Sequence, residues 1–588
     1  MLLDNSSNLG ICFRIFTLVI SLYAVPAHAL DFFVDSASDD VDNTPGNGTC
    51  DTIIGECTLR AAIQEVTQGS TSTIYNIYLL ANTYILDLNG AELIADAGDL
   101  NIDSSGSTIL ITAQSGTNAS NVIIESGALT DRIFHIMDAA SVTFRNITIQ
   151  NANTTVIGGA IYNVSGGSLT LDGVVLNNNA TSAANGGGAI YSNSGTTTIS
   201  DSTLSNNQAS SGWGGAIYNA AGSTLTVSTT TFNNNGANSA GGAIYHANTT
   251  ANSLSISEST FQSNSSSTSG GGLHNAGGAS INGSLFTQNS VLANGAIFGG
   301  GGIANSSTLT IKNTTISENQ TLAYGGGIHN GNSASANLTL NNVTITGNSA
   351  DLDNDSIGDG GGLYADTSTT VNYSNTIIAN NTDASSEAPD CGGASITSLG
   401  NNIVGNILGC SIGGTQSNDQ TGDPLLAALA DNGGPTLTHA LNTGSIAIDA
   451  GNQNIPDGNA PNCETTDQRG FSRPVDGDSD LVAYCDIGAY ELDPNSSGTP
   501  ITGGGCYIAT AAYGTGMEKD VVTLRRFRDR YLLSNEPGKL FTELYYKLSP
   551  PVATRISSSN TLREWARASL IPLVSLGRIL GEPEPTQR

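Results

Sequence analysis

Four aspartates have the spacing of a calcium-binding loop. They stand at positions 1, 3, 5 and 9 of one short segment: Asp351, Asp353, Asp355 and Asp359. Carboxylates spaced in this way wrap a loop around a hard cation that prefers oxygen ligands, although position 6 is Ser356, where an EF-type loop has glycine. The sequence therefore indicates calcium as the candidate cofactor. The alternative is an exposed acidic loop that carries no ion.

A second acidic group follows the same alternation over a shorter stretch: Asp476, Asp478 and Asp480. It is a weaker metal candidate because it has three carboxylates and no ninth-position partner. Here too the alternative is a solvated loop.

A row of rings is the second feature that could contact a ligand. The chain repeats a short motif in which an aliphatic residue follows a glycine pair. In most copies an aromatic or histidine residue comes next: Tyr162, Tyr191, Tyr218, Tyr245, His274, His329 and Tyr364. Because successive side chains of a strand point to opposite faces, these rings should face outward. Such a stripe could bind sugar faces or a partner protein, or it could simply cover a sheet by ring-on-ring stacking.

The chain contains little of the chemistry that cuts a polysaccharide. A lyase needs a basic side chain beside calcium-binding carboxylates, yet between Arg60 and residue 421 the basic residues are only Arg132, Arg145 and Lys312. We find no Gly-His-Gly string, no His-x-x-x-His spacing and no Gly-x-Ser-x-Gly elbow. The sequence leaves enzymatic activity uncertain and favours a non-enzymatic role.

The N-terminus and the cysteines indicate export. An apolar run from Ile15 to Val25 precedes Ala27-His28-Ala29, so residues 1–29 have the pattern of a signal peptide. Six cysteines lie in local pairs, which predicts three disulfides: Cys50–Cys57, Cys391–Cys410 and Cys463–Cys485. Cys506 is left over, follows three glycines and opens a basic tail. We therefore expect Cys506 to be a point of anchoring, processing or covalent attachment at the envelope, the rival being pairing with another chain or burial.

Charge is distributed very unevenly. Residues 30–505 hold 6 basic and 41 acidic side chains, a net −35, whereas residues 506–588 hold 12 basic and 8 acidic, a net +4. An acidic body repels nucleic acid and polyanionic glycans and attracts divalent cations. We expect no nucleic-acid partner, and we expect the basic tail to associate with a membrane surface.

The elements that must position these residues are repeats. An aliphatic column follows each glycine pair (Ile161, Ile190, Ile217, Ile244, Leu273, Ile303, Ile328, Leu363), at spacings of 25 to 35 residues. A second apolar column runs from Leu176 to Ile378, and three residues after each member stands an asparagine, from Asn179 to Asn381. Three short strands per unit predict an all-β, right-handed parallel β-helix over residues 70–420, with the asparagines stacked as a ladder.

The repeats also resemble a known family. Gly-Gly-Ala-Ile occurs from Gly158, Gly187, Gly214 and Gly241, and Phe-x-x-Asn from Phe232, Phe261 and Phe286. This alternation resembles the passenger repeats of polymorphic outer-membrane proteins. The resemblance implies a β-helical surface adhesin, although residues 506–588 look helical and leave no room for that family's membrane barrel.

Three further segments resemble parts of secreted bacterial proteins. Cys57-Thr58-Leu59-Arg60-Ala61-Ala62, in residues 30–69, resembles the CSLREA motif, with Thr58 as the N-cap of a short amphipathic helix that should shield the first coil. Residues 421–492, which contain Asp431-Asn432-Gly433-Gly434 and Cys485-Asp486-Ile487-Gly488-Ala489-Tyr490-Glu491, resemble a choice-of-anchor Q domain. This small cap domain should close the stack. After a flexible linker at 493–505, the short α-helical tail 506–588 resembles the CFI-box domain.

These observations predict an exported protein of the cell surface, the outer membrane or the extracellular space. Its long body would present a face to a surface glycan or protein partner, as an adhesin-like or envelope-binding protein. The alternatives are a polysaccharide-active, pectate-lyase-like enzyme and a purely structural surface spacer.

Overall fold

The fold was analysed in a computed structural model, which describes residues 29–494 apart from 91–94, 96, 115, 116, 118, 128, 138, 165, 293–297, 332, 334 and 356. In the C-terminal region it describes only 524, 563, 566, 567, 569–572 and 574. The predicted signal peptide, most of the linker, Cys506 and most of the tail therefore lie outside the described residues.

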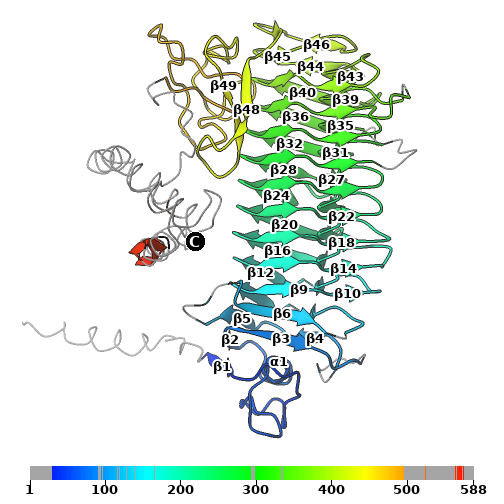
Figure 1. The fold of residues 1–588 in the computed structure, drawn as a ribbon, viewed down its shortest axis with the longest axis vertical. Helices are drawn as coiled ribbons and strands as arrows, with labels where there is room; N and C mark the ends of the chain where they lie inside the picture. Colours follow the sequence, from blue (N-terminus) through cyan, green and yellow to red (C-terminus); the bar gives the residue numbers. More distant parts are fainter. Residues whose placement is uncertain are drawn as a thin grey trace, which may run out of the picture.

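The described body is a stack of β-coils whose strands form four parallel sheets (Figure 1). Sheet A has 14 strands: β1 (Leu30–Val34), β2 (Ile74–Leu79), β5 (Thr108–Ala113), β8 (Ser141–Arg145), β12 (Ser168–Asp172), β16 (Gly195–Ser200), β20 (Ser223–Ser228), β24 (Leu254–Ser257), β28 (Ala279–Asn282), β32 (Thr308–Lys312), β36 (Asn337–Asn341), β40 (Thr370–Ser374), β44 (Ile396–Ser398) and β46 (Ile412–Gly414).

Sheet B has 13 strands and follows sheet A along each coil. Its strands are β3 (Asn82–Leu86), β6 (Val122–Ser126), β9 (Thr148–Gln150), β13 (Val175–Asn177), β17 (Thr203–Ser205), β21 (Thr231–Asn233), β25 (Thr260–Gln262), β29 (Leu285–Thr287), β33 (Thr315–Ser317), β37 (Thr344–Thr346), β41 (Ile377–Ala379), β45 (Ile403–Val404) and β47 (Gln420–Thr421).

Sheets C and D complete the wall, with 11 and 9 strands. Sheet C contains β4 (Leu100–Asp103), β7 (Phe134–Met137), β11 (Ile161–Val164), β15 (Ile190–Asn193), β19 (Ile217–Asn219), β23 (Ile244–His246), β27 (Leu273–Asn275), β31 (Ile303–Asn305), β35 (Ile328–Asn330), β39 (Leu363–Ala365) and β43 (Cys391–Gly393). Sheet D contains β10 (Asn153–Thr154), β14 (Ala180–Thr181), β18 (Gln208–Ala209), β22 (Gly236–Ala237), β26 (Ser265–Ser266), β30 (Ser290–Val291), β34 (Gln320–Thr321), β38 (Ser349–Ala350) and β42 (Thr382–Asp383).

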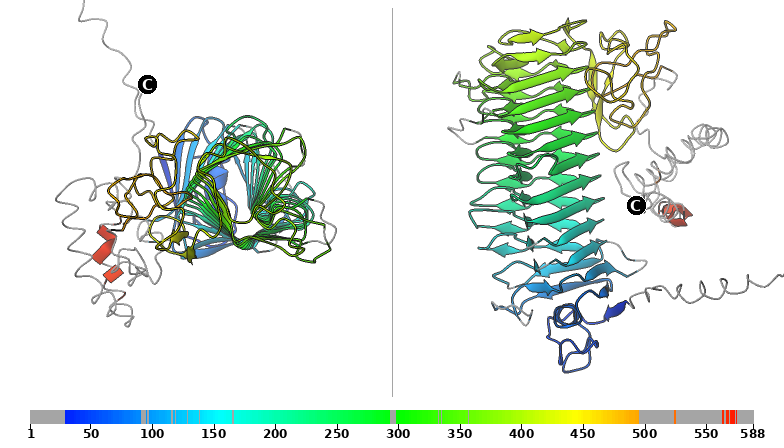
Figure 2. Two further views of the ribbon diagram at one scale, coloured as in Figure 1. Left: turned by 90° about the horizontal axis from the view of Figure 1, so that it is seen from above. Right: turned by 180° about the vertical axis from the view of Figure 1, so that it is seen from behind.

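A full coil, such as β11 to β14, visits the sheets in the order C, A, B, D, and equivalent residues of successive coils pair in parallel register. Among the described residues, the first coils and the last coil have no strand in sheet D. The predicted aliphatic column therefore lies on sheet C and the second column on sheet B, and every member of both columns is fully buried. The view along the stack shows the coils superposed around one interior (Figure 2). The prediction of a parallel β-helix is confirmed.

The asparagine ladder is confirmed at hydrogen-bond level. The side-chain amide of each asparagine from Asn179 to Asn348 donates to the side-chain oxygen of the next, at 2.9 to 3.1 Å. The same oxygen also accepts the backbone N–H of the preceding asparagine, for example Asn264 N to Asn289 Oδ1 at 3.0 Å. Since these groups are buried, the ladder satisfies polar atoms that water cannot reach.

The glycine pairs form the tight turn from sheet D into sheet C. The first glycine of each pair has a positive φ, for example +71° at Gly241. The second has no room for a side chain, since a Cβ on Gly242 would lie 2.1 Å from the carbonyl oxygen of Gly271. Only glycine meets both demands, which explains why the phrase recurs.

The N-terminal helix α1 (Leu59–Gln68) covers the first coil, as predicted (Figure 1). The Ala61 N–H donates to Thr58 Oγ1 at 3.0 Å, so Thr58 is the N-cap. Leu59, Ile63 and Val66 are buried against the end of the stack. The helix therefore closes the hydrophobic interior at this end.

The segment 421–492 does not close the other end of the stack. It contains the antiparallel hairpin β48 (Leu426–Ala430) and β49 (Thr438–Leu441), and it lies beside the upper coils in both side views (Figures 1 and 2). Gln468 contacts the coils directly: Thr315 Oγ1 donates to its side-chain oxygen at 2.6 Å, and its amide donates to the Ser284 carbonyl at 3.1 Å. The predicted placement was wrong, because residues at the junction of sheets A and B, such as Ser284 and Thr315, bind this segment along the side of the stack.

The three predicted disulfides are present: Cys50–Cys57, Cys391–Cys410 and Cys463–Cys485. The first disulfide lies in the loop before α1 and the second in the last coils. The third lies within residues 421–492, which we call the lateral segment. Within the described part of the chain, no helix is long and apolar enough to cross a membrane.

Candidate functional site

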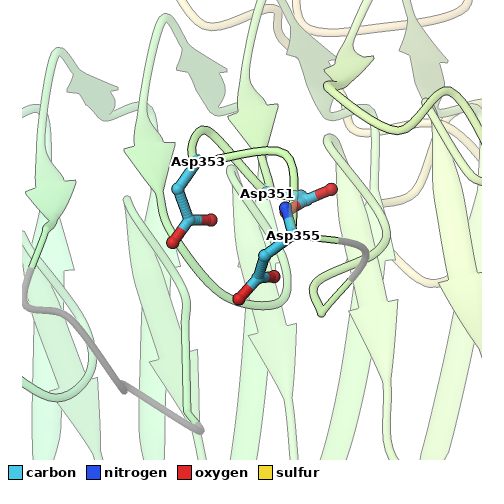
Figure 3. Close-up of side chains that lie close together, drawn as sticks. All are labelled: Asp351, Asp353 and Asp355. Carbon is cyan, nitrogen blue, oxygen red and sulfur yellow. The ribbon is translucent and has the colours of Figure 1, made fainter.

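The acidic loop connects β38 to β39 on the side of the stack (Figure 3). Asp351 is fully buried and has a φ of +49°. Its backbone carbonyl accepts the Asn354 N–H at 2.9 Å, and its Oδ1 accepts the Asp355 N–H at 3.1 Å. The loop thus turns back on itself around the first aspartate.

Three of the four predicted aspartates come together. Each of Asp351, Asp353 and Asp355 offers a carboxylate oxygen, and these oxygens lie within 4.8 Å of one another. Asp353 and Asp355 are exposed, whereas Asp351 is fully buried. Such an arrangement can hold a hard cation.

Asp359 lies outside this group of three. Its backbone carbonyl accepts the Gly325 N–H at 2.9 Å, so it already belongs to the glycine turn of the next strand. Burial raises the pKa of its carboxyl, and Asp383, Glu387 and Asp351 raise it further. The structure thus brings the first three carboxylates together and leaves the fourth outside the group.

The second acidic group has a different membership from the predicted one. Asp476 and Asp478 cluster with Asp449, and Asp480 is not part of the cluster. Asp449 Oδ2 accepts the N–H groups of Gly477 and Asp478, at 2.8 and 3.0 Å, and Asp476 accepts those of Ser479 and Leu481. These carboxylates organise backbone turns. Asp449 was missed as a neighbour because it stands 27 residues before Asp476.

The predicted ring stripe forms a stacked row on the outer side of sheet C. Ring centroids are 4.7 Å apart for Tyr191 and Tyr218, 5.2 Å for Tyr218 and Tyr245, and 4.9 Å for Tyr245 and His274. His135 extends the row, with its ring 4.9 Å from Tyr162. Sequence alone missed His135 because it precedes the first glycine pair.

The row is less exposed than the alternation predicted. Tyr191, His274 and His329 are buried, and Tyr162, Tyr218, Tyr245 and Tyr364 are half-buried. Trp213, from the loop before β19, lies against Tyr218 and Tyr245 with centroids 6.1 and 5.5 Å away. The rings lie on the outer side of sheet C, but loops between sheets D and C, such as the one that carries Trp213, cover part of the row. The half-buried rings and Trp213 remain available to a ligand.

Burial favours the neutral form of three of the described histidines. Burial lowers the pKa values of His135, His246 and His274 to about 4. The Asn219 side-chain amide donates to His246 Nδ1 at 2.8 Å, and His246 Nε2 lies 3.0 Å from Ser253 Oγ. His329 Nδ1 accepts the Gly299 N–H, and its Nε2 lies 3.1 Å from Asp366 Oδ1. Among described residues, no metal-binding group includes a histidine.

The basic side chains of the coils are paired with acids. Arg145 Nε lies 2.8 Å from Asp172 Oδ2, and Lys312 Nζ lies 3.0 Å from Glu464 Oε1. Arg132 lies 3.3 Å from Asp131 and also stacks over the Tyr162 ring at 5.0 Å. In residues 70–420, so far as the structure describes them, each lysine or arginine has an acidic partner.

A groove of about 370 Å³ separates sheet B from the lateral hairpin. Its polar lining includes Gln262, Gln288 and Glu318, which form a chain of hydrogen bonds: Gln262 donates to Gln288 at 3.3 Å, and Gln288 donates to Glu318 at 3.0 Å. Among the described residues that line this groove, there is one carboxylate and no basic side chain. A pair of acid and base groups is therefore lacking there.

The repeats are similar to a known repeat family. The Chlamydia polymorphic membrane protein repeat matches residues 201–220 and 229–247, which contain β17 to β19 and β21 to β23. This match agrees with the predicted resemblance of the repeats. The resemblances to CSLREA, choice-of-anchor Q and CFI-box segments remain predictions.

Several solved structures share the solenoid architecture at low similarity. Pectate lyase Pel9A has 14% identity and a TM-score of 0.37, covering 80% of this chain and 98% of that chain. The A-module of mannuronan C-5 epimerase AlgE6 of Azotobacter vinelandii has 12% identity and a TM-score of 0.35, covering 67% and 98%. A rhamnogalacturonan lyase has 11% identity and a TM-score of 0.33, covering 71% and 96%. A search of curated protein sequences found no match. At these TM-scores the neighbours carry no argument about activity.

Proposed function

We propose that this protein is an exported, cell-surface β-helix that binds a glycan or protein partner along its side and does not cut polymers. The observation that carries the proposal is the state of its basic side chains. A lyase needs a cationic base free to approach the substrate, whereas Arg132, Arg145 and Lys312 each lie against a carboxylate.

Export and surface location are supported by three features. The first 29 residues have the pattern of a signal peptide. The body contains three disulfides, which persist in oxidising compartments. The matched repeat is described as that of a membrane protein family of Chlamydia.

The binding face we propose is the ring row around Trp213. Tyr218, Tyr245 and Trp213 are half-buried and lie on neighbouring coils. Aromatic faces of this kind combine apolar area with a polar edge, which suits the faces of sugar rings as well as protein side chains. The acidic body makes a neutral glycan or a basic protein a better partner than a polyanion.

The test is a glycan array and a cell-adhesion assay on the secreted chain, run beside an assay for polymer cleavage. We expect binding without cleavage, and a large loss of binding in Trp213→Ala. Phe33→Ala is the matched control: Phe33 is 57% exposed and stacks on Tyr78 at 4.9 Å, but it lies on sheet A at the N-terminal end. Release of shorter fragments from any polymer would favour an enzyme. Absence of binding in all formats would favour a structural spacer.

We further propose retention at the envelope through the tail 506–588, with Cys506 as the attachment point. The support is sequence alone: a free cysteine after a glycine-rich linker, followed by a basic tail. Fractionation of cells that express wild type, Cys506→Ala or a truncation after Gly505 tests both parts. Both variants should appear in the medium. Cell association of the truncation at the wild-type level would refute retention by the tail, and the same result for Cys506→Ala would refute the role of Cys506.

A further inference from the structure

We propose that Asp351, Asp353 and Asp355 bind one calcium ion on the side of the stack, in the loop between β38 and β39. This site is separate from the proposed binding face, so either proposal can fail without the other. The argument starts from the geometry of the three carboxylates and then from an unsatisfied buried charge.

The distances suit calcium. Ligand oxygens bind Ca²⁺ at about 2.3–2.6 Å, so two ligands of one ion lie at most roughly 5 Å apart. Mg²⁺ binds at about 2.0–2.1 Å, which limits that separation to roughly 4 Å. The oxygens of Asp351, Asp353 and Asp355 all lie within 4.8 Å of one another, which is inside the limit for calcium. Calcium also accepts flexible coordination, whereas Mg²⁺ demands near-ideal octahedral geometry, so a loop with two exposed carboxylates suits calcium better.

The second observation is independent of the spacing. Asp351 is fully buried, and its Oδ2 has no hydrogen-bond partner, while its Oδ1 accepts only the Asp355 N–H among the bonds of this loop. A buried carboxylate that lacks a partner is strongly unfavourable, so such an atom indicates a missing ion or water. An ion shared with Asp353 and Asp355 would remove this cost.

The described coils offer no basic side chain in place of that ion. Between Lys312 and Arg469 the sequence has no lysine or arginine. Lys312 is paired with Glu464, and Arg469 with Asp467 at 2.7 Å. A cation from solvent would supply the positive charge beside Asp351, and Asp353 and Asp355, which lie next to it in the loop (Figure 3), are exposed.

The second acidic cluster lacks this feature and serves as a control. Asp449 and Asp476 use both oxygens of each carboxylate to accept backbone N–H groups. Nothing there is buried and unsatisfied, so we expect no ion at Asp449, Asp476 and Asp478.

Isothermal titration calorimetry of the full secreted chain with CaCl₂ in physiological salt tests the proposal. Physiological salt screens diffuse attraction to the acidic body. We expect one ion per chain, with a dissociation constant on the order of 10⁻⁴ to 10⁻³ M, the range of extracellular modules. Asp353→Asn and Asp355→Asn should each weaken binding by about tenfold or more, since each removes one ligand charge from the site. Both residues are exposed, so these variants should fold.

The double variant Asp476→Asn, Asp478→Asn should bind calcium as the wild type does, and Mg²⁺ should bind more weakly than Ca²⁺. Three results would overturn the proposal: no calcium binding by the wild type, unchanged binding in both Asp353→Asn and Asp355→Asn, or loss of binding in the Asp476/Asp478 control. Equal or tighter binding of Mg²⁺ would overturn the choice of calcium.

Discussion

The side-chain amide of Asn264 donates a hydrogen bond to Asn289 Oδ1 at 2.9 Å, across one full coil of the stack. Both side chains are fully buried. Asn264 also donates to the Phe232 carbonyl at 3.0 Å, and its own Oδ1 accepts both the backbone and the side-chain N–H of Asn235. One residue therefore satisfies polar groups of three successive coils.

Asn264→Ala should strongly destabilise the stack. The substitution leaves the Asn235 backbone N–H without its acceptor and removes the Asn264 amide as a donor to the Phe232 carbonyl and to Asn289 Oδ1. Asn289 Oδ1 keeps the backbone N–H of residue 264, and each buried loss costs about 1–3 kcal/mol. We expect a decrease in the free energy of unfolding of roughly 3 kcal/mol or more, measured by chemical denaturation. Gln262→Ala, at a half-buried position at the end of β25 two residues earlier, should change it by less than about 0.5 kcal/mol. Equal effects of the two variants would contradict this role of the ladder.

Gly242→Ala should also destabilise the protein, for a steric reason. A Cβ at this position would lie 2.1 Å from the Gly271 carbonyl oxygen and 2.5 Å from that of Ser265, and both are backbone atoms that cannot turn away. We expect a loss of about 3 kcal/mol, the upper part of the range for overpacking. The control is Gly413→Ala, where the nearest atom is the Ser395 hydroxyl at 3.2 Å, which can rotate. A thermal melt that ranks the two variants in the opposite order would refute the steric account.

The parts of the fold that sequence predicted correctly are those that depend on short-range geometry. Each coil repeats the same turn, so the buried columns, the Asn179 to Asn381 ladder and the local disulfides could be inferred from spacing. The Asp351, Asp353 and Asp355 group was predictable for the same reason, since its members lie within one loop. The separate position of Asp359 could not be inferred from the spacing, which does not show that its carbonyl accepts the Gly325 N–H in the following turn.

Long-range contacts could not be inferred from spacing. Gln468 binds the Ser284 carbonyl, 184 residues earlier, and no repeat relates the two. The same holds for Arg60, whose buried guanidinium pairs with Asp39 at 2.7 Å and donates to the carbonyls of Ala95 and Gly98. We expected α1 to cover the first coil, but not that Arg60 would fix the helix to the neighbouring loops through these contacts.

The buried His246 should make stability fall as the solution becomes acidic. Burial lowers the pKa of His246 to about 4 in the folded protein, whereas an unfolded chain has a histidine pKa of about 6.5. The unfolded state therefore binds a proton first, so stability is complete above pH 6.5 and is lost as the pH falls toward 4. The full contribution is on the order of 3 kcal/mol.

His246→Asn isolates this effect. Asparagine occupies the neighbouring positions of the same column, Asn219 and Asn275, so it fits the wall. Buried Asp486 and Glu491 have raised pKa values, because burial disfavours their charged forms, and they oppose the histidine effect at acidic pH. The measurement is therefore the difference between wild type and variant in denaturation experiments from pH 4.5 to 7.5. A difference that stays constant over this range would show that His246 does not titrate as expected.

Gln468→Ala should loosen the lateral segment without unwinding the coils. The Gln468 side chain is nearly fully buried and joins three places: it accepts from Thr315, and it donates to the Ser284 carbonyl and to Thr436 Oγ1 at 2.9 Å. Its loss leaves these groups unsatisfied at the contact between segment and stack. Hydrogen exchange should then accelerate at the Gly488 and Ala489 amides, which bond to Asn375 O and Thr344 Oγ1 of the coils. Exchange in the asparagine ladder should stay unchanged, because the ladder lies inside the wall.

Asn454→Ala, at an exposed site of the same segment, is the matched control. Unchanged exchange at Gly488 and Ala489 in Gln468→Ala would mean that other contacts, such as Lys312 with Glu464, hold the segment in place.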